Sequence, residues 1–469
     1  MKILHASFEC YPLAKVGGLA DVVGSLPKFQ NEISATSKVI MPYYNNDFFK
    51  NRSKTVDLYT GTIKIDKLSY EYSIKELKSN EINFDVLIVY IEDLLDRDNV
   101  YGYGDEVIQY IAFQLSILNW LVNENIDFDI IHCHDHHTSL IPFFVKYCYE
   151  FQKLKNIHTV LTIHNAQYQG IFPHNRIDLL PEFNQENIGI LDWYNSINPL
   201  ATGIKCASRV TTVSSTYLEE LKEKANGLEG LLRSEEGKCK GILNGIDTSV
   251  WNPYTDVMII KNYKISNVIS GKKANKQKLC NTYAFDKDLP LFGFIGRLVG
   301  EKAADLLPKA IEQALDENRI NILILGSGHK EIEDQLIELK EKYKGRFSAY
   351  IGYDEKLSRL IYAGVDFLLM PSRVEPCGLN QMYALRYGTI PIVRRTGGLK
   401  DTVIDIGDGG FGICHDQASV WDICYSIKRA ITFYNDKKFF RSIQKRIMKI
   451  DNSWNTSAKK YIEVYKSIQ

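Results

Sequence analysis

Several features that mark common classes of protein are missing from this sequence of 469 residues. Lysine plus arginine equals aspartate plus glutamate at 57 each, so no bulk charge favours nucleic acid or an anionic membrane as a partner. There is no run of eighteen apolar residues, which predicts that no segment spans a membrane. The first glycine-containing loop, residues 11–21, has neither the GxGxxG nor the GxxxxGK[ST] pattern. Dinucleotide and Walker-type nucleotide sites are therefore not indicated there.

Cysteine is present but is not arranged as a framework. The nine cysteines are scattered, odd in number and without a CxxC pair. This pattern predicts reduced thiols and no zinc site. Met1 leads directly into an apolar segment, Ile3–Ser7, with no basic leader or cleavage site before it. We therefore expect a cytoplasmic protein.

Short apolar runs alternate with helical patterns along the chain, and this alternation predicts an α/β fold with parallel sheets covered by helices. A stretch with few core signals, from Asn252 to about Gly271, separates two series of runs and is interpreted as a connection between domains. The expected strands are Ile3–Ser7, Val39–Met41, Val86–Tyr90, Ile130–His132, Val160–Ile163, Val210–Val213, Gly241–Leu243, Leu291–Ile295, Ile322–Leu325, Ala349–Ile351, Phe367–Met370 and Ile390–Val393.

The segment around Glu375 carries the strongest functional signal. An apolar run ending at Met370 and Pro371 predicts a buried strand, and Glu375-Pro376 is expected to open the following helix. Free backbone N–H groups at such a helix start, together with the Glu375 carboxylate, suit a polyhydroxylated ligand such as a sugar. The alternative is a structural turn with a solvated glutamate.

Two further loops predict phosphate binding. Lys15 precedes the pair Gly17-Gly18, which comes just before a helical pattern and offers an anion-accepting helix start. Arg297 and Lys302 follow the strand expected at Leu291–Ile295, and the two permanent positive charges are typical of a phosphate grip. Each loop also has a plainer interpretation as a surface turn with solvated charges.

Polar clusters follow two neighbouring strands of the first half. His132 to His137 comes after Ile130-Ile131, and His164-Asn165 comes after Val160–Ile163. Because ligands bind at the carboxyl edge of open α/β sheets, these clusters predict one edge of an active site. The spacing is wrong for a helix-face metal pair and no second ligand cluster is evident, so a metal site is the weaker interpretation.

Motifs in this order along nearly the whole chain resemble those of bacterial glycogen synthases, the ADP-glucose-using type shared with plant starch synthases. They are KVGGLADV (15–22), HDHH (134–137), TIHNAQYQG (162–170), GLEGLL (227–232), ILNGID (242–247), IGRLVGEK (295–302), GYDE (352–355), PSRVEPCGLNQ (371–381) and RRTGGLKDTV (394–403). KVGGLAD and EPCGL together are specific. One departure is His136, where the family usually has tryptophan.

The resemblance implies two Rossmann-like, doubly wound domains facing across a cleft, the GT-B type of glycosyltransferase. It places the first domain at 1–250, the second at 251–452, and a C-terminal helix crossing back to the first at 453–469. It also implies retaining transfer of glucose from ADP-glucose to the 4-hydroxyl of an α-1,4-glucan such as glycogen.

The resemblance also assigns roles to residues. Arg297 and Lys302 would grip the diphosphate, helped by Lys15, Gly17 and Gly18. The sugar would be held by Glu375, Cys377, Gly378 and Leu379, the adenine by Tyr353, and the ribose or phosphate by Asn380. The remaining positions would face glucose, the acceptor or the donor: Asp21, Asp135, His164, Asn165 and Asn244. With three cations available, neither a metal nor another cofactor is expected.

Four other functions share part of this pattern. A glucosyltransferase using a UDP- or GDP-sugar would have a similar phosphate grip. An oxidoreductase would need the GxGxxG loop and an acidic residue about twenty positions later. A glycogen phosphorylase would need pyridoxal phosphate on a lysine, and a non-catalytic glucan-binding protein would not need Lys15, Arg297 and Lys302 together.

Overall fold

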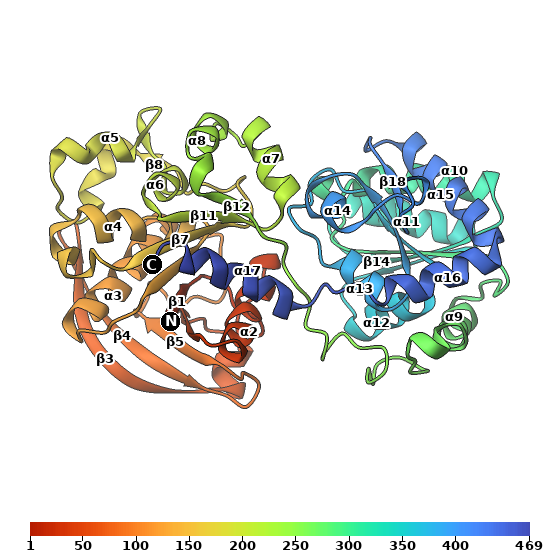
Figure 1. Cartoon of the computed structure of the whole chain (residues 1–469), viewed down its shortest axis with the longest axis horizontal. Coiled ribbons are helices and arrows are strands. Elements are labelled where there is room, and N and C mark those ends of the chain that lie inside the picture. The colour runs from red at the N-terminus through yellow and green to blue at the C-terminus, as the bar shows by residue number, and fades with distance from the viewer. The chain divides into compact units, whose positions relative to one another are not determined.

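The computed structural model describes residues 1–469 and contains two compact units (Figure 1). The first consists of Met1–Leu243 with Trp454–Gln469, and the second of Asn244–Ser453. Residues 244–250, expected in the first domain, therefore pack with the second unit. None of the helices has the length and apolar content that crossing a membrane requires.

The first unit is built on a nine-stranded sheet in the order β12-β11-β7-β6-β1-β2-β5-β4-β3. Neighbouring strands of this sheet pair in parallel, except that β4 is antiparallel to both β3 and β5. The strands are β1 (Lys2–Ala6), β2 (Thr36–Pro42), β3 (Lys54–Ile65), β4 (Leu68–Lys78), β5 (Asp85–Tyr90), β6 (Ile130–His134), β7 (His158–Ile163), β11 (Arg209–Thr212) and β12 (Cys239–Gly241). A small separate sheet joins β8 (Phe172–Pro173), β10 (Ser196–Ile197) and β9 (Asp192–Trp193).

Helices of the first unit connect these strands, and several begin at side chains that satisfy a free N–H group. Asn198 accepts from the N–H of Ala201 at the start of α6, and Ser214 accepts from Tyr217 at the start of α7. The helices are α1 (Gly18–Val23), α2 (Leu26–Glu32), α3 (Glu106–Asn123), α4 (Ile141–Tyr147), α5 (Ile188–Leu191), α6 (Pro199–Cys206), α7 (Ser215–Glu223), α8 (Glu229–Ser234) and α17 (Trp454–Lys466).

The last helix, α17, packs into the first unit although it ends the chain. Figure 1 shows it in blue beside the red α2. Trp454, Ala458 and Tyr461 share an apolar core with Ile3 of β1 and Leu26 of α2. The helix expected within 453–469 is present as α17, and its apolar face explains why the segment docks there.

The second unit has six strands, all parallel, in the order β15-β14-β13-β16-β17-β18. They are β13 (Leu291–Ile295), β14 (Asn321–Gly326), β15 (Phe347–Ile351), β16 (Phe367–Met370), β17 (Ile390–Arg394) and β18 (Ile413–His415). The helices are α9 (Val268–Tyr283), α10 (Leu307–Glu317), α11 (Lys330–Lys342), α12 (Glu355–Gly364), α13 (Asn380–Arg386), α14 (Gly397–Thr402), α15 (Val420–Asn435) and α16 (Lys437–Ile447). Every residue of β14 and β16 is buried, as a parallel strand covered on both faces requires.

Eleven of the twelve expected strands overlap the observed strands closely, and the twelfth is shifted from Gly241–Leu243 to Cys239–Gly241. The pattern missed the long β3–β4 hairpin, whose exposed positions give no continuous apolar run. Two expectations were wrong. Glu375-Pro376 does not open a helix, because α13 begins only at Asn380. The segment after Asn252 is not a bare connection, because Ile259 and Tyr263 are buried in the second core.

Candidate active site

In the first unit, three adjacent strands bring the predicted loops to one edge of the sheet. β7, β6 and β1 are neighbours and parallel, so their carboxyl ends lie together. These ends carry His164 and Asn165 after β7, Asp135 after β6, and the loop containing Lys15 and Gly17 after β1. The grouping of the His132–His137 and His164-Asn165 loops at one sheet edge is therefore borne out by the topology, which places the Lys15 loop at the same edge.

Asp135 organises two of these loops. Its Oδ1 accepts the backbone N–H of His164 at 2.7 Å and that of Asn165 at 3.4 Å. Its backbone has φ 57° and ψ −173°, a region that costs a non-glycine residue about 1–3 kcal/mol. Burial raises the pKa of Asp135 to about 7, against the lowering effect of the two N–H groups. The strained, buried carboxylate thus fixes the position of His164.

The backbone of the glycine loop after β1 is bonded to a carboxylate of the same unit, Glu9, which the motifs did not reveal. Glu9, which is buried, accepts the N–H groups of Val16 at 2.6 Å and Gly17 at 2.8 Å, and Tyr101 donates its hydroxyl to Glu9 at 2.8 Å. Gly17 therefore already donates its N–H within the unit. Glu9 lies three positions beyond the end of β1, after Ser7 and Phe8, so the pattern of a polar residue directly after a strand did not mark it.

Lys15 and Asp21 form an ion pair at 2.7 Å, at the start of α1. Burial raises the pKa of Asp21, and the positive charge of Lys15 opposes that rise. A Cβ atom built on Gly17 or Gly18 would meet nothing within 4 Å, so the loop has open space in front of it. Lys15 is thus held by Asp21, and the backbone at Gly17 and Gly18 leaves room for a ligand beside this loop.

A cluster of histidines lies beneath this edge. His5, His132 and His134 are buried, and their ring nitrogens lie within 4.8 Å of one another, a spacing that could hold a metal. Every ring nitrogen of the three already has a hydrogen-bond partner. A bound metal would have to replace those bonds, so the geometry favours a hydrogen-bonded network.

In the second unit, the three adjacent strands β13, β16 and β17 carry the predicted residues. Lys302, in the loop after β13, donates to both carboxylate oxygens of Glu375, in the loop after β16, at 2.6 Å each. Ser372 donates to the same carboxylate at 2.8 Å. The backbone N–H groups of Arg373 and Val374 bond the carbonyl oxygen of Glu301 at 2.8 and 3.2 Å, so the two loops form one structure.

Glycine allows the loop after β17 to pack against the loops after β13 and β16. A Cβ atom on Gly397 would lie 2.0 Å from the carbonyl oxygen of Glu375, so only glycine permits this contact. Gly378 has φ +71°, the left-handed region that glycine adopts without strain. The Asn380 side chain donates to the carbonyl of Ile295 at 2.8 Å, which ties the start of α13 to the end of β13.

The remaining predicted residues of this unit lie in different surroundings. Cys377 is buried, and burial raises the pKa of its thiol to about 12, so it packs rather than reacts. Asn244 lies beside it, and its buried Oδ1 has no hydrogen-bond partner. Arg297 is 64% exposed and pairs with Glu301 at 3.2 Å. Tyr353 follows β15, is 85% exposed, and is separated from β13 by β14. Leu379 precedes α13.

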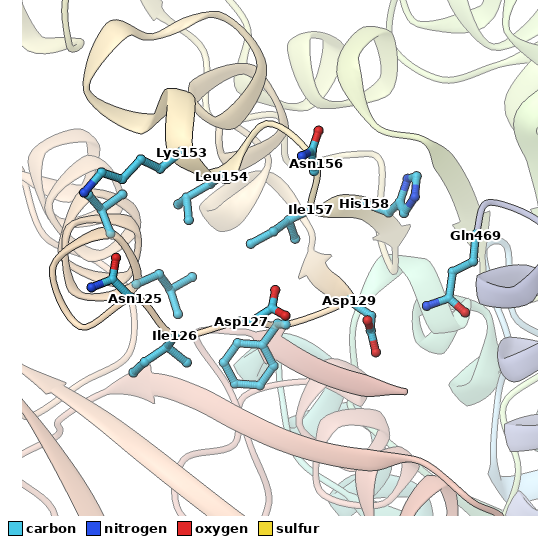
Figure 2. Close-up of a pocket in the computed structure, with 13 residues that line it drawn as sticks. Asn125, Ile126, Asp127, Asp129, Lys153, Leu154, Asn156, Ile157, His158 and Gln469 are labelled. Carbon is cyan, nitrogen blue, oxygen red and sulfur yellow. The ribbon is translucent and has the colours of Figure 1, made fainter.

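A pocket of about 470 Å³ lies elsewhere in the first unit. Figure 2 shows Asp127, Asp129, Lys153, His158 and Gln469 around it. Apart from Gln469, which follows α17, these residues lie at or before the amino ends of β6 and β7, the edge opposite Asp135 and His164. None of the predicted site residues lines it. Because ligands of such sheets bind at the carboxyl edge, we place the active site there and not in this pocket.

Comparison with known families agrees with this division of the chain. The family described as the starch synthase catalytic domain matches residues 2–234, and the family described as glycosyl transferases group 1 matches residues 275–432. The catalytic domain of starch synthase IV from Arabidopsis thaliana, bound to ADP and acarbose, has a TM-score of 0.88 at 30% identity and covers 100% of this chain and 99% of its own. Two Rossmann-like units with these matches define a glycosyltransferase of the GT-B type.

Relatives of known name cover the full chain. A glycogen synthase from Flavobacterium johnsoniae is 53% identical over 470 residues, with 100% of this chain and 99% of the relative aligned. One from Thermodesulfovibrio yellowstonii is 37% identical over 495 residues, with 100% and 98% aligned. The chain belongs to the glycogen and starch synthase family. A sucrose-phosphate synthase from Thermosynechococcus elongatus, with 14% identity and a TM-score of 0.62, shares the fold alone.

Proposed function

We propose that this glycosyltransferase moves glucose from ADP-glucose to the non-reducing 4-hydroxyl of an α-1,4-glucan and retains the anomeric configuration. The observation that carries the proposal is the joined set of loops after β13, β16 and β17. It holds Lys302 and Glu375 in contact, with Arg297 on the same loop as Lys302. The bound ADP of the Arabidopsis starch synthase supports an adenine nucleotide as the donor.

The charges suit this reaction. When the bond between glucose C1 and the diphosphate breaks, negative charge develops on the leaving ADP, and fixed cations stabilise it. Arg297 and Lys302 would supply that charge without a metal ion, and Lys15 would act likewise. Glu375 would accept hydrogen bonds from glucose hydroxyls, helped by the loop from Cys377 to Leu379.

Retention normally involves an enzyme nucleophile, but the carboxylates of the candidate site are already engaged. Glu375 is held by Lys302 and Ser372, and Asp135 by two backbone N–H groups. We therefore propose attack by the acceptor on the face that the phosphate leaves. The bond from C1 to the phosphate oxygen breaks, the bond from C1 to the acceptor oxygen forms, and the acceptor proton passes to the leaving phosphate.

The test compares labelled ADP-glucose with UDP- and GDP-glucose, each with glycogen as primer and EDTA in the buffer. We expect label to enter the polymer chiefly from ADP-glucose, and an α-1,4-specific glucan hydrolase to release it. Equal or better use of another donor would refute the donor assignment. Activity lost in EDTA and restored by Mg²⁺ would refute the metal-free mechanism. A cytoplasmic location belongs to the same proposal and is supported by nine free cysteines.

A further inference from the structure

A chain of hydrogen-bonded side chains, called the file below, crosses the interior of the first unit. It runs from His164 at the predicted site to Tyr465 in the last helix, α17. His164 Nε2 lies 2.9 Å from His134 Nδ1, and His134 Nε2 lies 3.1 Å from His5 Nδ1. His5 Nε2 lies 2.8 Å from Oε1 of Gln30 in α2, and the Gln30 amide nitrogen donates to the Tyr465 hydroxyl in α17 at 3.1 Å. All five residues are buried.

The histidines of this file carry one proton each. Burial lowers the pKa of His5 to about 4 and that of His164 to about 3, and it holds the pKa of His134 well below its usual range. A neutral imidazole has one nitrogen that donates and one that accepts. Because a proton on one nitrogen leaves the other bare, the tautomer of one ring fixes the tautomer of the next ring in the file.

Gln30 sets that direction. Its Oε1 can only accept, and it accepts from Ser37 at 2.7 Å as well as from His5. His5 must then carry its proton on Nε2 and accept at Nδ1 from His134. His134 in turn accepts at Nδ1 from His164 Nε2. The proton of His164 is thus on Nε2, which leaves its Nδ1 bare.

The Tyr465 hydroxyl binds the Gln30 amide nitrogen, so the amide can turn only if this hydroxyl also changes from acceptor to donor. This hydroxyl accepts from the Gln30 nitrogen and is left to donate to His132 Nδ1 at 2.7 Å. His132 Nε2 then donates to Thr162 Oγ1 at 2.6 Å, so this branch is satisfied as well. Turning the amide by 180° would place its nitrogen against His5 and reverse every proton in the file.

We propose that Gln30 and Tyr465 are positioning residues, which keep His164 in one tautomer with a bare Nδ1 that accepts a hydrogen bond from a sugar hydroxyl. The inference rests on the proposed function, because it takes His164 as a residue that contacts the donor or acceptor glucose. The C-terminal helix thereby contributes to the chemistry of the first unit through Tyr465, without touching the substrate itself.

The test uses the full chain with ¹⁵N-labelled histidine, and His164→Asn identifies the His164 signals. The wild type should show His164 protonated only on Nε2. Gln30→Met removes the acceptor, so a population protonated on Nδ1 should appear and kcat should fall about tenfold with little change in KM. Gln30→Glu keeps an acceptor-only group and should keep the tautomer. Tyr465→Phe leaves the amide free to turn and should give a mixture with less structural disruption.

Gln114→Met is the matched control. Gln114 is a buried glutamine of the same unit whose Oε1 accepts the N–H groups of Leu140 and Ile141 at 2.9 and 3.0 Å. It should lower stability but leave the His164 tautomer and kcat unchanged. A wild type protonated on Nδ1 would overturn the proposal. So would a pure Nε2 tautomer in both Gln30→Met and Tyr465→Phe, or a tautomer mixture with wild-type kcat. The spectra need no substrate, so an inactive wild type would refute the proposed function while they still decide the proton order.

Discussion

Replacing Lys302 by methionine would leave the Glu375 carboxylate in a buried position without its counter-ion. Glu375 is 6% exposed, and it would keep only the hydroxyl of Ser372 as a donor. Removing one partner of a buried ion pair costs about 3–5 kcal/mol, and because the Lys302 side chain is 24% exposed we expect about 3 kcal/mol. For a unit of about 200 residues this lowers the melting temperature by roughly 6–12 °C.

The double variant Lys302→Met/Glu375→Gln separates stability from catalysis. It removes the uncompensated charge and keeps a hydrogen bond to Ser372, so it should melt several degrees above Lys302→Met. Its kcat should stay low, because the cation for the leaving diphosphate is still missing. Scanning calorimetry of the full chain measures the melting of the second unit, and the transfer assay with labelled ADP-glucose measures kcat.

An exposed ion pair of the same chemistry provides the control. Lys330 and Asp334 in α11 have side chains 76% and 53% exposed, and Lys330→Met should change stability by about 0.5 kcal/mol or less. The reasoning would be refuted if Lys302→Met melted with the wild type. It would also be refuted if the double variant were no more stable than the single one, since the cost would then come from lost packing and not from the stranded charge.

Three other predictions follow. Arg297→Ala, at an exposed position, should cost about 2.7–4 kcal/mol of transition-state stabilisation by analogy with a lost oxyanion donor, seen as a hundredfold or greater fall in kcat with an unchanged melting temperature. An increase in KM alone would contradict it. Because the pKa of Asp135 is raised to about 7, kcat/KM should rise with pH through about 7, and Asp135→Asn should abolish that dependence. The buried histidines His5, His136 and His164 have a pKa of about 4, 4 and 3, below the unfolded value, so their contribution is complete above pH 6.5 and is lost as pH falls. At pH 5 each loses about 2 kcal/mol. Asp135, whose folded pKa is raised, stabilises at low pH and regains only about 2 kcal/mol. The melting temperature of the first unit should therefore fall between pH 6.5 and 5, and a constant value would contradict this.

The sequence predicted most of the parallel strands because each is a short apolar run followed by polar or glycine residues. The same pattern located Asp135 and His164, which directly follow strands, and Glu375, which lies in the loop after β16, since loops at the carboxyl ends of strands lie at the edge where ligands bind. The β3–β4 hairpin was missed because its residues are largely exposed and mix charges with apolar side chains.

Contacts between distant residues could not be predicted from local patterns. Lys302 looked like a free cation on a loop, but it pairs with Glu375, 73 positions away. Glu9 and its bond to the Gly17 N–H were missed for the same reason. The start of α13 at Asn380 was also missed, because Glu375 is in close contact with Gly397 and Asn380 is bonded to the carbonyl oxygen of Ile295.

Hydrogen bonds already made inside the first unit decide which group of the glycine loop could bind a phosphate. Gly17 already donates its N–H to Glu9 at 2.8 Å, and Tyr101 holds the same carboxylate in place. A phosphate placed against that N–H would have to displace a buried carboxylate and would then face its negative charge. Lys15, in contrast, pairs with Asp21 and lies over the Tyr11 ring at 5.4 Å. Its side chain is 46% exposed, so it can turn toward a ligand at the cost of these two contacts. In this loop, therefore, Lys15 is the group suited to bind phosphate. Glu9 fixes the backbone that follows Lys15 by accepting the N–H groups of Val16 and Gly17.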